Sequence, residues 1–148
     1  MGVFNTLYSI IGDFNERSFL DLFGGSGIMS LEALSRGFSY VEVWEKHPKV
    51  ISVIKDNYRN LKLNPNLKTG DSLKNIDKID KAFDVIYIDP PYASGIYEQV
   101  LNLLKTKISH ETIVIAEHDS EINNDGYQIL RSKNYGGKMV SFFRLEPV

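Results

Sequence analysis

The residues best suited to chemistry in this sequence are four consecutive ones, Asp89, Pro90, Pro91 and Tyr92. The two prolines fix two φ angles and remove two backbone donors. The Asp89 carboxylate and the Pro90 carbonyl can then present hydrogen-bond acceptors in one rigid arc, with the flat face of Tyr92 above it. This arrangement suits a planar group with an exocyclic NH₂, whose N–H groups bond to the acceptors while the nitrogen lone pair faces an electrophile. A turn capped by an aspartate is the alternative.

A glycine-rich segment stands where a predicted strand turns into a helix, and it contains Asp21, Phe23, Gly24, Gly25 and Gly27. Glycines at such a turn let the backbone turn tightly and approach a ligand closely. The spacing is not G-x-G-x-x-G, and no Lys-Ser/Thr pair follows, so a P-loop is excluded. The acid at position 21 favours a ligand with a positive or donor group over a pyrophosphate. A tight turn that binds nothing is the alternative.

Acidic residues also follow the next two predicted strands. Glu45 lies 20 residues after Gly25, where an acid can accept hydrogen bonds from both ribose hydroxyls of a nucleoside ligand. A solvated glutamate at a helix entry is the alternative. Asp71 and Ser72 follow the third strand and could accept a donor from an adenine amino group, although an aspartate there can equally cap a helix.

The elements that must position these residues alternate between strands and helices. The patterns predict strands at Phe19–Phe23, Tyr40–Trp44, Leu67–Gly70, Phe83–Ile88 and Thr112–Glu117, helices at Phe4–Ile11, Ile28–Arg36, Pro48–Lys62 and Tyr97–Lys105, and a closing hairpin of Gln128–Lys133 and Met139–Leu145. Such alternation predicts an α/β fold with a parallel sheet covered on both faces. Ligands then bind beyond the carboxyl ends of the strands. We expect the first helix to pack at the sheet edge.

The composition describes one soluble globular domain of 148 residues, with 43% hydrophobic and 24% charged residues. No stretch approaches the roughly 18 apolar residues that a membrane span needs. The sequence has no cysteine, which excludes disulfides and thiolate metal sites and fits a reducing cytosol. The N-terminus lacks the pattern of a secretory signal. His47, His110 and His118 show no metal-ligand spacing, so we expect no metal site.

The net charge of −2 argues against a protein that coats nucleic acid by charge alone. The segment from 131 to 144 nevertheless carries four basic residues and no acid, namely Arg131, Lys133, Lys138 and Arg144. This hairpin could contact phosphates. Ordinary solubilising charges on an edge hairpin are the equal alternative.

Taken together, these motifs resemble those of class I S-adenosylmethionine-dependent methyltransferases that act on amino nitrogens. More narrowly, the glycine loop and its Leu31–Gly37 continuation, with Val43–Lys46 and Tyr135-Gly136, resemble the RsmD-like 16S ribosomal RNA guanine-N2 methyltransferases. The resemblance implies a Rossmann-like, seven-stranded, doubly wound and mostly parallel sheet with an antiparallel C-terminal hairpin strand. It also implies that residues 1–148 form a single domain that lacks the segment usually preceding Phe4 in that family.

The resemblance further implies the role of each residue. Gly25 and Gly27 would line the methionine part of the cofactor, Asp21 would contact its amino end, Glu45 would hold the ribose and Asp71 would face the adenine. The implied cofactor-binding set is Asp21, Phe23, Gly24, Gly25, Gly27, Glu45, Lys46, Asp71 and Ser72, and the implied catalytic set is Asp89, Pro90, Pro91 and Tyr92.

We therefore expect a cytoplasmic, monomeric enzyme that methylates the exocyclic N2 of a guanine in small-subunit ribosomal RNA, within a ribonucleoprotein. The same acceptor arc could serve adenine N6, cytosine N4 or a protein glutamine amide. A non-catalytic methyltransferase-like protein is a further alternative, which the intact Asp89–Tyr92 motif opposes. A nicotinamide oxidoreductase would leave that motif unexplained.

Overall fold

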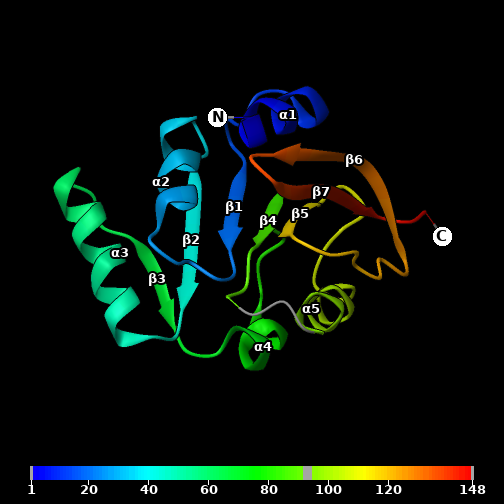
Figure 1. Cartoon of the computed structure of the whole chain (residues 1–148). Helices are drawn as coiled ribbons and strands as arrows, with labels where there is room; N and C mark the ends of the chain where they lie inside the picture. The colour runs from blue at the N-terminus through cyan, green and yellow to red at the C-terminus, as the bar shows by residue number, and fades with distance from the viewer. Residues whose placement is uncertain (1, 92–94, 148) are drawn as a thin grey trace.

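A computed structural model describes residues 2–91 and 95–147. Its centre is one seven-stranded sheet of order β3-β2-β1-β4-β5-β7-β6 (Figure 1). The first five strands in that order pair in parallel, and β7 is antiparallel to both its neighbours. The strands are β1 (Ser18–Asp21), β2 (Tyr40–Glu45), β3 (Asn66–Thr69), β4 (Val85–Ile88), β5 (Ile113–His118), β6 (Tyr127–Tyr135) and β7 (Lys138–Leu145). The expected Rossmann-like sheet with an antiparallel closing strand is confirmed.

Helices cover both faces of the sheet. They are α1 (Gly2–Ile11), α2 (Ile28–Ser35), α3 (Pro48–Asn60), α4 (Ser72–Asn75), the 3₁₀ turn η1 (Ile76–Lys78) and α5 (Ile96–Leu104). Side chains alternate along each strand, so Phe19, Val85 and Ile113 face α1, while Leu20, Ile86 and Val114 face α5 and η1. None of the helices in the described segments has the length and apolar character needed to cross a membrane.

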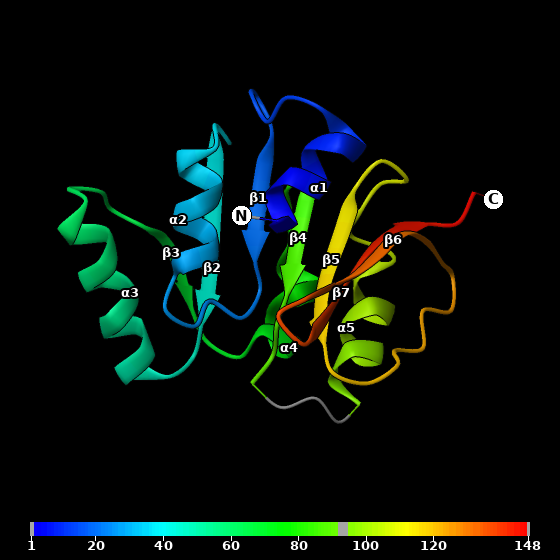
Figure 2. The same cartoon turned by 45° about the horizontal axis from the view of Figure 1, so that its top comes forward.

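The first helix lies elsewhere than expected. We expected it at the sheet edge, but α1 lies over the middle strands, in front of β1 and β4 (Figure 2). Its Phe4 and Leu7 are fully buried in one cluster with Phe19 of β1 and Ile115 of β5. The expectation was wrong because a single amphipathic helix covers more apolar area over the centre of a sheet than along its edge.

Most boundaries of the predicted elements differ from the observed ones by one or two residues, but two differences affect the site. β2 continues through Glu45, so this acid is the last strand residue and not a loop residue. The segment after β3 also forms the short helix α4 and the turn η1, which the sequence analysis did not predict. Asp71 is the N-cap of α4, and η1 follows α4 directly.

Parallel pairing brings the carboxyl ends of β1, β2 and β4 to one edge of the sheet (Figure 2). In the register, Asp21 of β1 stands beside Val43 of β2 and Tyr87 of β4. The glycine loop and the segment that starts at Asp89 therefore leave neighbouring strands at the same edge.

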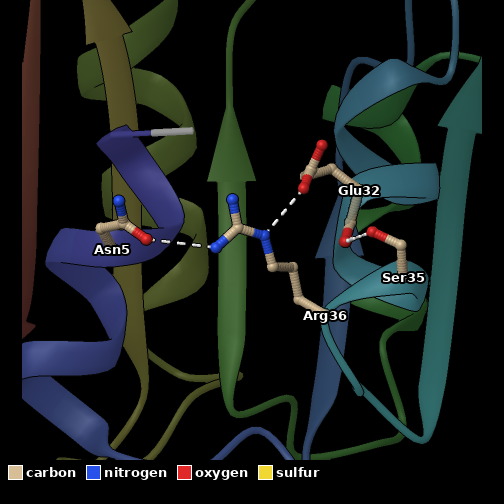
Figure 3. A network of polar contacts seen from close by, with 4 residues as sticks. All are labelled: Asn5, Glu32, Ser35 and Arg36. Carbon is tan, nitrogen blue, oxygen red and sulfur yellow. Dashed lines mark hydrogen bonds and ion pairs between the residues drawn. The ribbon is translucent and has the colours of Figure 1, made fainter.

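Arg36, at the end of α2, ties this helix to α1 (Figure 3). Its Nε donates to Glu32 Oε2 at 2.8 Å and its Nη1 donates to Asn5 Oδ1 at 3.1 Å. The guanidinium also lies 5.8 Å from the centroid of the Phe4 ring, in cation–π range. These contacts join two helices of one face without a covalent link.

We predict that Arg36→Ala lowers the free energy of unfolding by about 1 kcal/mol, because a partly buried ion pair, a hydrogen bond and a cation–π contact are lost together. Urea unfolding measures this. Arg59→Ala is the matched control, since its ion pair with Asp56 is highly exposed and should change stability by less than about 0.3 kcal/mol. Equal effects of the two substitutions would show that the contacts of Arg36 with α1 do not stabilise the fold.

Candidate active site

The glycine loop is shaped by close packing on one side and open space on the other. Gly24 N donates to the Trp44 carbonyl at 2.8 Å, and a Cβ at Gly24 would stand 2.4 Å from Val43 Cγ2. Only glycine lets the loop approach β2 this closely. Gly25 has a φ of +54°, and a Cβ there would meet no atom within 4 Å. The loop thus presents bare backbone to open space, as a close-fitting ligand requires.

Asp21 lies beneath this loop and is only 1% exposed. Its Oδ1 accepts a hydrogen bond from Phe23 N at 3.2 Å. Burial raises the pKa of the Asp21 carboxyl to about 7, although the Phe23 N–H opposes this, and the nearby charges of Asp89, Glu45 and Glu117 raise it further. A cation placed here would therefore be attracted to four acidic side chains.

Glu45 joins the loop to the start of α3. Its Oε1 accepts from Gly25 N at 3.2 Å, and its Oε2 accepts from Lys46 N at 3.0 Å and His47 N at 3.1 Å. A carboxylate has about four acceptor positions, so three backbone bonds leave room for one more donor. Glu45 is thus held in a fixed direction and still able to bind a hydroxyl.

A pocket beside the loop brings together residues that are far apart in the sequence. It is lined by Leu22, Phe23, Trp44, Glu45, Lys46, His47, Gly70, Asp71, Ser72, Leu73, Pro91 and Ile96. Six of the predicted site residues are in this set. Of the other predicted residues that the structure describes, Asp21, Gly24, Gly25 and Gly27 belong to β1 and the loop, and Asp89 and Pro90 follow β4. The mixture of apolar walls and carboxylates suits a nucleoside.

Two lining residues also hold the local fold. Asp71 Oδ1 accepts from Leu73 N at 3.0 Å, so the capping alternative is correct for this carboxylate. Ser72 is buried, and its hydroxyl donates to the Leu22 carbonyl. Ser72 therefore joins α4 to the segment after β1, and this bond uses the only proton of its hydroxyl.

Asp89 follows β4 and is half-buried. Its Oδ1 lies 3.8 Å from Lys138 Nζ of β7. Burial is the main cause that raises the pKa of Asp89 to about 6, with Glu117 next, while Lys138 acts in the opposite direction. Pro90 is buried behind it. Tyr92, which was predicted to stack on the substrate, lies outside the described residues.

Sequence reasoning missed two neighbours of Asp89. Glu117 is the penultimate residue of β5, and the sequence analysis gave it no role beyond the end of a predicted strand. The rule that placed Glu45, an acid at the carboxyl end of a buried strand, would have found it. Lys138 was predicted only as one of four basic hairpin residues, and no local pattern relates it to Asp89.

The three histidines do not form a metal centre in the part of the chain that the structure describes, where no group of three or more His, Asp or Glu residues could hold a metal ion. His118 is engaged at both ring nitrogens. Nδ1 lies 2.8 Å from the Ser120 carbonyl and Nε2 lies 2.8 Å from Ser141 Oγ. It therefore joins β5 to β7.

A family model described as conserved hypothetical protein 95 matches residues 1–144. The chain belongs to the RsmD-like methyltransferase family. This match covers the glycine loop, the residues that line the pocket and nearly all of the hairpin.

Individual RsmD-like relatives agree with this assignment. A Bacillus subtilis protein, YlbH, assigned by its name as an rRNA methyltransferase, is 30% identical over 125 residues, which is 79% of this chain and 68% of that protein. Ribosomal RNA small subunit methyltransferase D of Buchnera aphidicola is 34% identical over 90 residues, or 60% of this chain and 47% of that protein. The chain thus spans about half to two thirds of the length of these relatives.

The fold of this chain is also similar to that of solved structures described as methyltransferases or methylases. A Haemophilus influenzae protein, HI0767, described as a methylase, superposes with a TM-score of 0.80 at 25% identity, covering 98% of both chains.

We predict that Asp21→Asn gains stability relative to the wild type as the pH rises. The folded-state pKa of about 7 exceeds the ordinary 3.8, so the wild type binds the proton more tightly when folded and loses stability as the pH rises from about 4 to 7. Asparagine keeps an oxygen for Phe23 N–H but carries no charge.

Urea unfolding followed through the buried Trp44 at pH 5 and pH 8 tests this. The stability advantage of Asp21→Asn should grow by roughly 1–3 kcal/mol between the two pH values. Asp89 also titrates in this range and interacts with Asp21, so the double variant Asp21→Asn/Asp89→Asn against Asp89→Asn alone isolates the contribution of Asp21. An advantage that does not change with pH contradicts the prediction.

Proposed function

We propose that this chain transfers a methyl group from S-adenosylmethionine to the exocyclic N2 of a guanine in small-subunit ribosomal RNA. The observation that carries the proposal is unbalanced negative charge. Asp21, Glu45, Asp89 and Glu117 converge on the edge of the sheet beside the pocket, and these four carboxyl groups outnumber the two lysines there, Lys138 paired with Asp89 and Lys46 in the pocket lining. A cationic ligand is favoured there, whereas the pyrophosphate of a nicotinamide dinucleotide is repelled.

The residues present fit this cofactor from end to end. Asp21 would hold the cationic amino end, and the backbone of Gly25 and Gly27 would lie along the methionine part. The remaining acceptor position of Glu45 would take a ribose hydroxyl, as Asp71 would take the adenine amino group. When bound, the cofactor supplies a methyl group that is already activated by its sulfonium, so no metal is needed for the transfer.

Asp89 and Pro90 would orient the acceptor. Their carboxylate and carbonyl oxygens accept the two N–H bonds of the guanine amino group and direct its lone pair at the methyl carbon. Holding two reactants at near-attack distance supplies most of the acceleration. The hydrogen bonds to Asp89 strengthen as the nitrogen becomes positive. Tyr92 would stack on the base.

The substrate class rests on the relatives whose names specify small-subunit ribosomal RNA. A base reaches the edge of this sheet only when it is splayed out of its stack, as RNA-modifying enzymes require. The family resemblance makes a structured ribonucleoprotein, rather than free RNA, the expected substrate. The exposed Arg131 and Lys133 of the hairpin would then contact phosphates.

Calorimetry with S-adenosylhomocysteine and with NAD tests the cofactor. We expect micromolar binding of the first and none of the second. Glu45→Gln should weaken binding about tenfold, since one ribose hydroxyl loses a charged acceptor worth roughly 1.5 kcal/mol. Glu146→Gln, at an exposed position far along the chain, is the control and should bind as the wild type does. Tight NAD binding would reject the proposal.

Transfer of labelled methyl to undermethylated small subunits, free RNA and a release-factor protein tests the reaction. We expect label at guanine N2 on the assembled subunit. Asp89→Ala should lower kcat by about 10²-fold or more while the affinity for S-adenosylhomocysteine stays within a factor of three. Label at adenine N6, cytosine N4 or a glutamine amide would contradict the proposed target, and full activity of Asp89→Ala would contradict the mechanism.

A further inference from the structure

Glu117, the penultimate residue of β5, is held by two tyrosine hydroxyls from different elements. Tyr87 of β4 donates to its carboxylate, and Tyr97 of α5 donates to its backbone carbonyl. Both tyrosines are almost fully buried. The direction of the Glu117 side chain is thus fixed from the core, which is unusual for an acid at a strand end.

The sheet register places this acid next to Asp89. Ile88 pairs with Ala116, and Asp89 and Glu117 are the residues that follow this last pair. Alternation puts Tyr87 and Glu117 on the face that α1 covers. Glu117 also pairs with Val140 of β7, two residues beyond Lys138, whose Nζ lies 3.8 Å from Asp89 Oδ1. The cation of this site therefore stands at Asp89, while Glu117 is held by a neutral hydroxyl.

Charged and titratable groups reach Asp89 from every element around it. They are Asp21 of β1, Tyr87 of β4, Tyr97 of α5, Glu117 of β5, Asp119 after β5 and Lys138 of β7. Lys138 is the cation in this set and the other ionised groups are carboxylates. Among these neighbours, Glu117 has the largest influence on the proton of Asp89.

The proposed methyl transfer leaves a proton to be removed. The guanine nitrogen forms a bond to the methyl carbon as the carbon–sulfur bond breaks, and the sulfur keeps that electron pair. The nitrogen then carries the methyl, two hydrogens and a positive charge. One proton must pass to a base within hydrogen-bond reach, and the Asp89 carboxylate already accepts one of these N–H groups in the proposed complex.

We propose that Glu117 is a positioning residue whose negative charge, held in place by the Tyr87 hydroxyl, makes Asp89 the proton acceptor of the reaction. The inference rests on the proposed function. Without a neighbouring anion, burial alone would oppose the effect of Lys138 on the proton of Asp89. With Glu117 beside it, the carboxylate takes up the proton near neutral pH, which is where a general base works best. The burial that raises the pKa of Asp89 acts in the same direction.

The first test needs no activity. In protein labelled with ¹³C at aspartate carboxyl groups, the Asp89 signal is assigned by its loss in Asp89→Asn and followed against pH. We expect a midpoint near 6 in the wild type. Glu117→Gln keeps an oxygen for the Tyr87 hydroxyl and should lower this midpoint by about half a unit or more. Asp119→Asn, an exposed neighbour, is the matched control and should lower it less.

The second test is the pH profile of kcat on the assembled subunit. Activity requires ionised Asp89, so the acid limb of Glu117→Gln should move to lower pH. Its rate at pH 8 should fall by about 3- to 10-fold, because Asp89 becomes a weaker base. The affinity for S-adenosylhomocysteine should not change. Tyr87→Phe, which frees the Glu117 carboxylate, should give a smaller change in the same direction.

The outcomes separate the two proposals. Two results overturn only the role of Glu117. In the first, the wild type is active but the pH profile of kcat is the same in Glu117→Gln. In the second, Glu117→Gln moves the Asp89 titration midpoint no more than Asp119→Asn does. If Glu117→Gln changes the affinity for S-adenosylhomocysteine but leaves the acid limb of the pH profile in place, Glu117 serves cofactor binding, and its proposed role is also overturned. A wild type that binds the cofactor but methylates no RNA overturns the proposed function, and the role of Glu117 in it, whatever the carboxyl titration shows.

Discussion

The burial of the Asp21 carboxyl beneath the glycine loop is the constraint on which the site depends. A carboxylate in so dry a position is stable only if it is neutral, hydrogen-bonded or opposite a cation. The hydrogen bond from Phe23 N–H partly stabilises the ionised carboxylate, whereas the negative charges of the acids around Asp21 destabilise it. The free protein therefore carries an electrostatic strain that a cationic ligand would relieve. Such a site costs stability and gains selectivity for the charge of its ligand.

The general outline of this molecule is predictable from the sequence because its strands are short apolar runs separated by glycine and proline residues that mark turns and helix starts. Gly24–Gly27 and Pro48 mark a loop and a helix start where the structure has them. The parallel order follows from the alternation of strands and helices, and it alone brings the glycine loop next to Asp89. Six predicted residues line one pocket, while the ligand roles assigned to them remain predictions.

What the sequence could not provide depends on distance across the fold. The position of α1 is set by total apolar area, which no local period encodes. Lys138 meets Asp89 only because a hairpin made late in the chain folds back beside β5. Glu117 was visible as a residue type, but its meaning depends on two tyrosines that lie 30 and 20 positions away. Asp71 is the opposite case. Its capping hydrogen bond is to Leu73, only two residues away, and the sequence analysis named helix capping as one of its two possible roles.

The strand order has a consequence for how the molecule assembles during synthesis. β7 is the last strand in the sequence, yet it stands between β5 and β6 and pairs with both. Until β7 has left the ribosome, β5 presents a bare edge of buried, β-branched residues, the kind of edge that joins with other chains. The first four strands in the sequence can pair early, whereas β5, which carries Glu117, gains its second neighbouring strand last. A nascent chain stalled before residue 138 would thus be prone to aggregate and would lack the cation that faces Asp89.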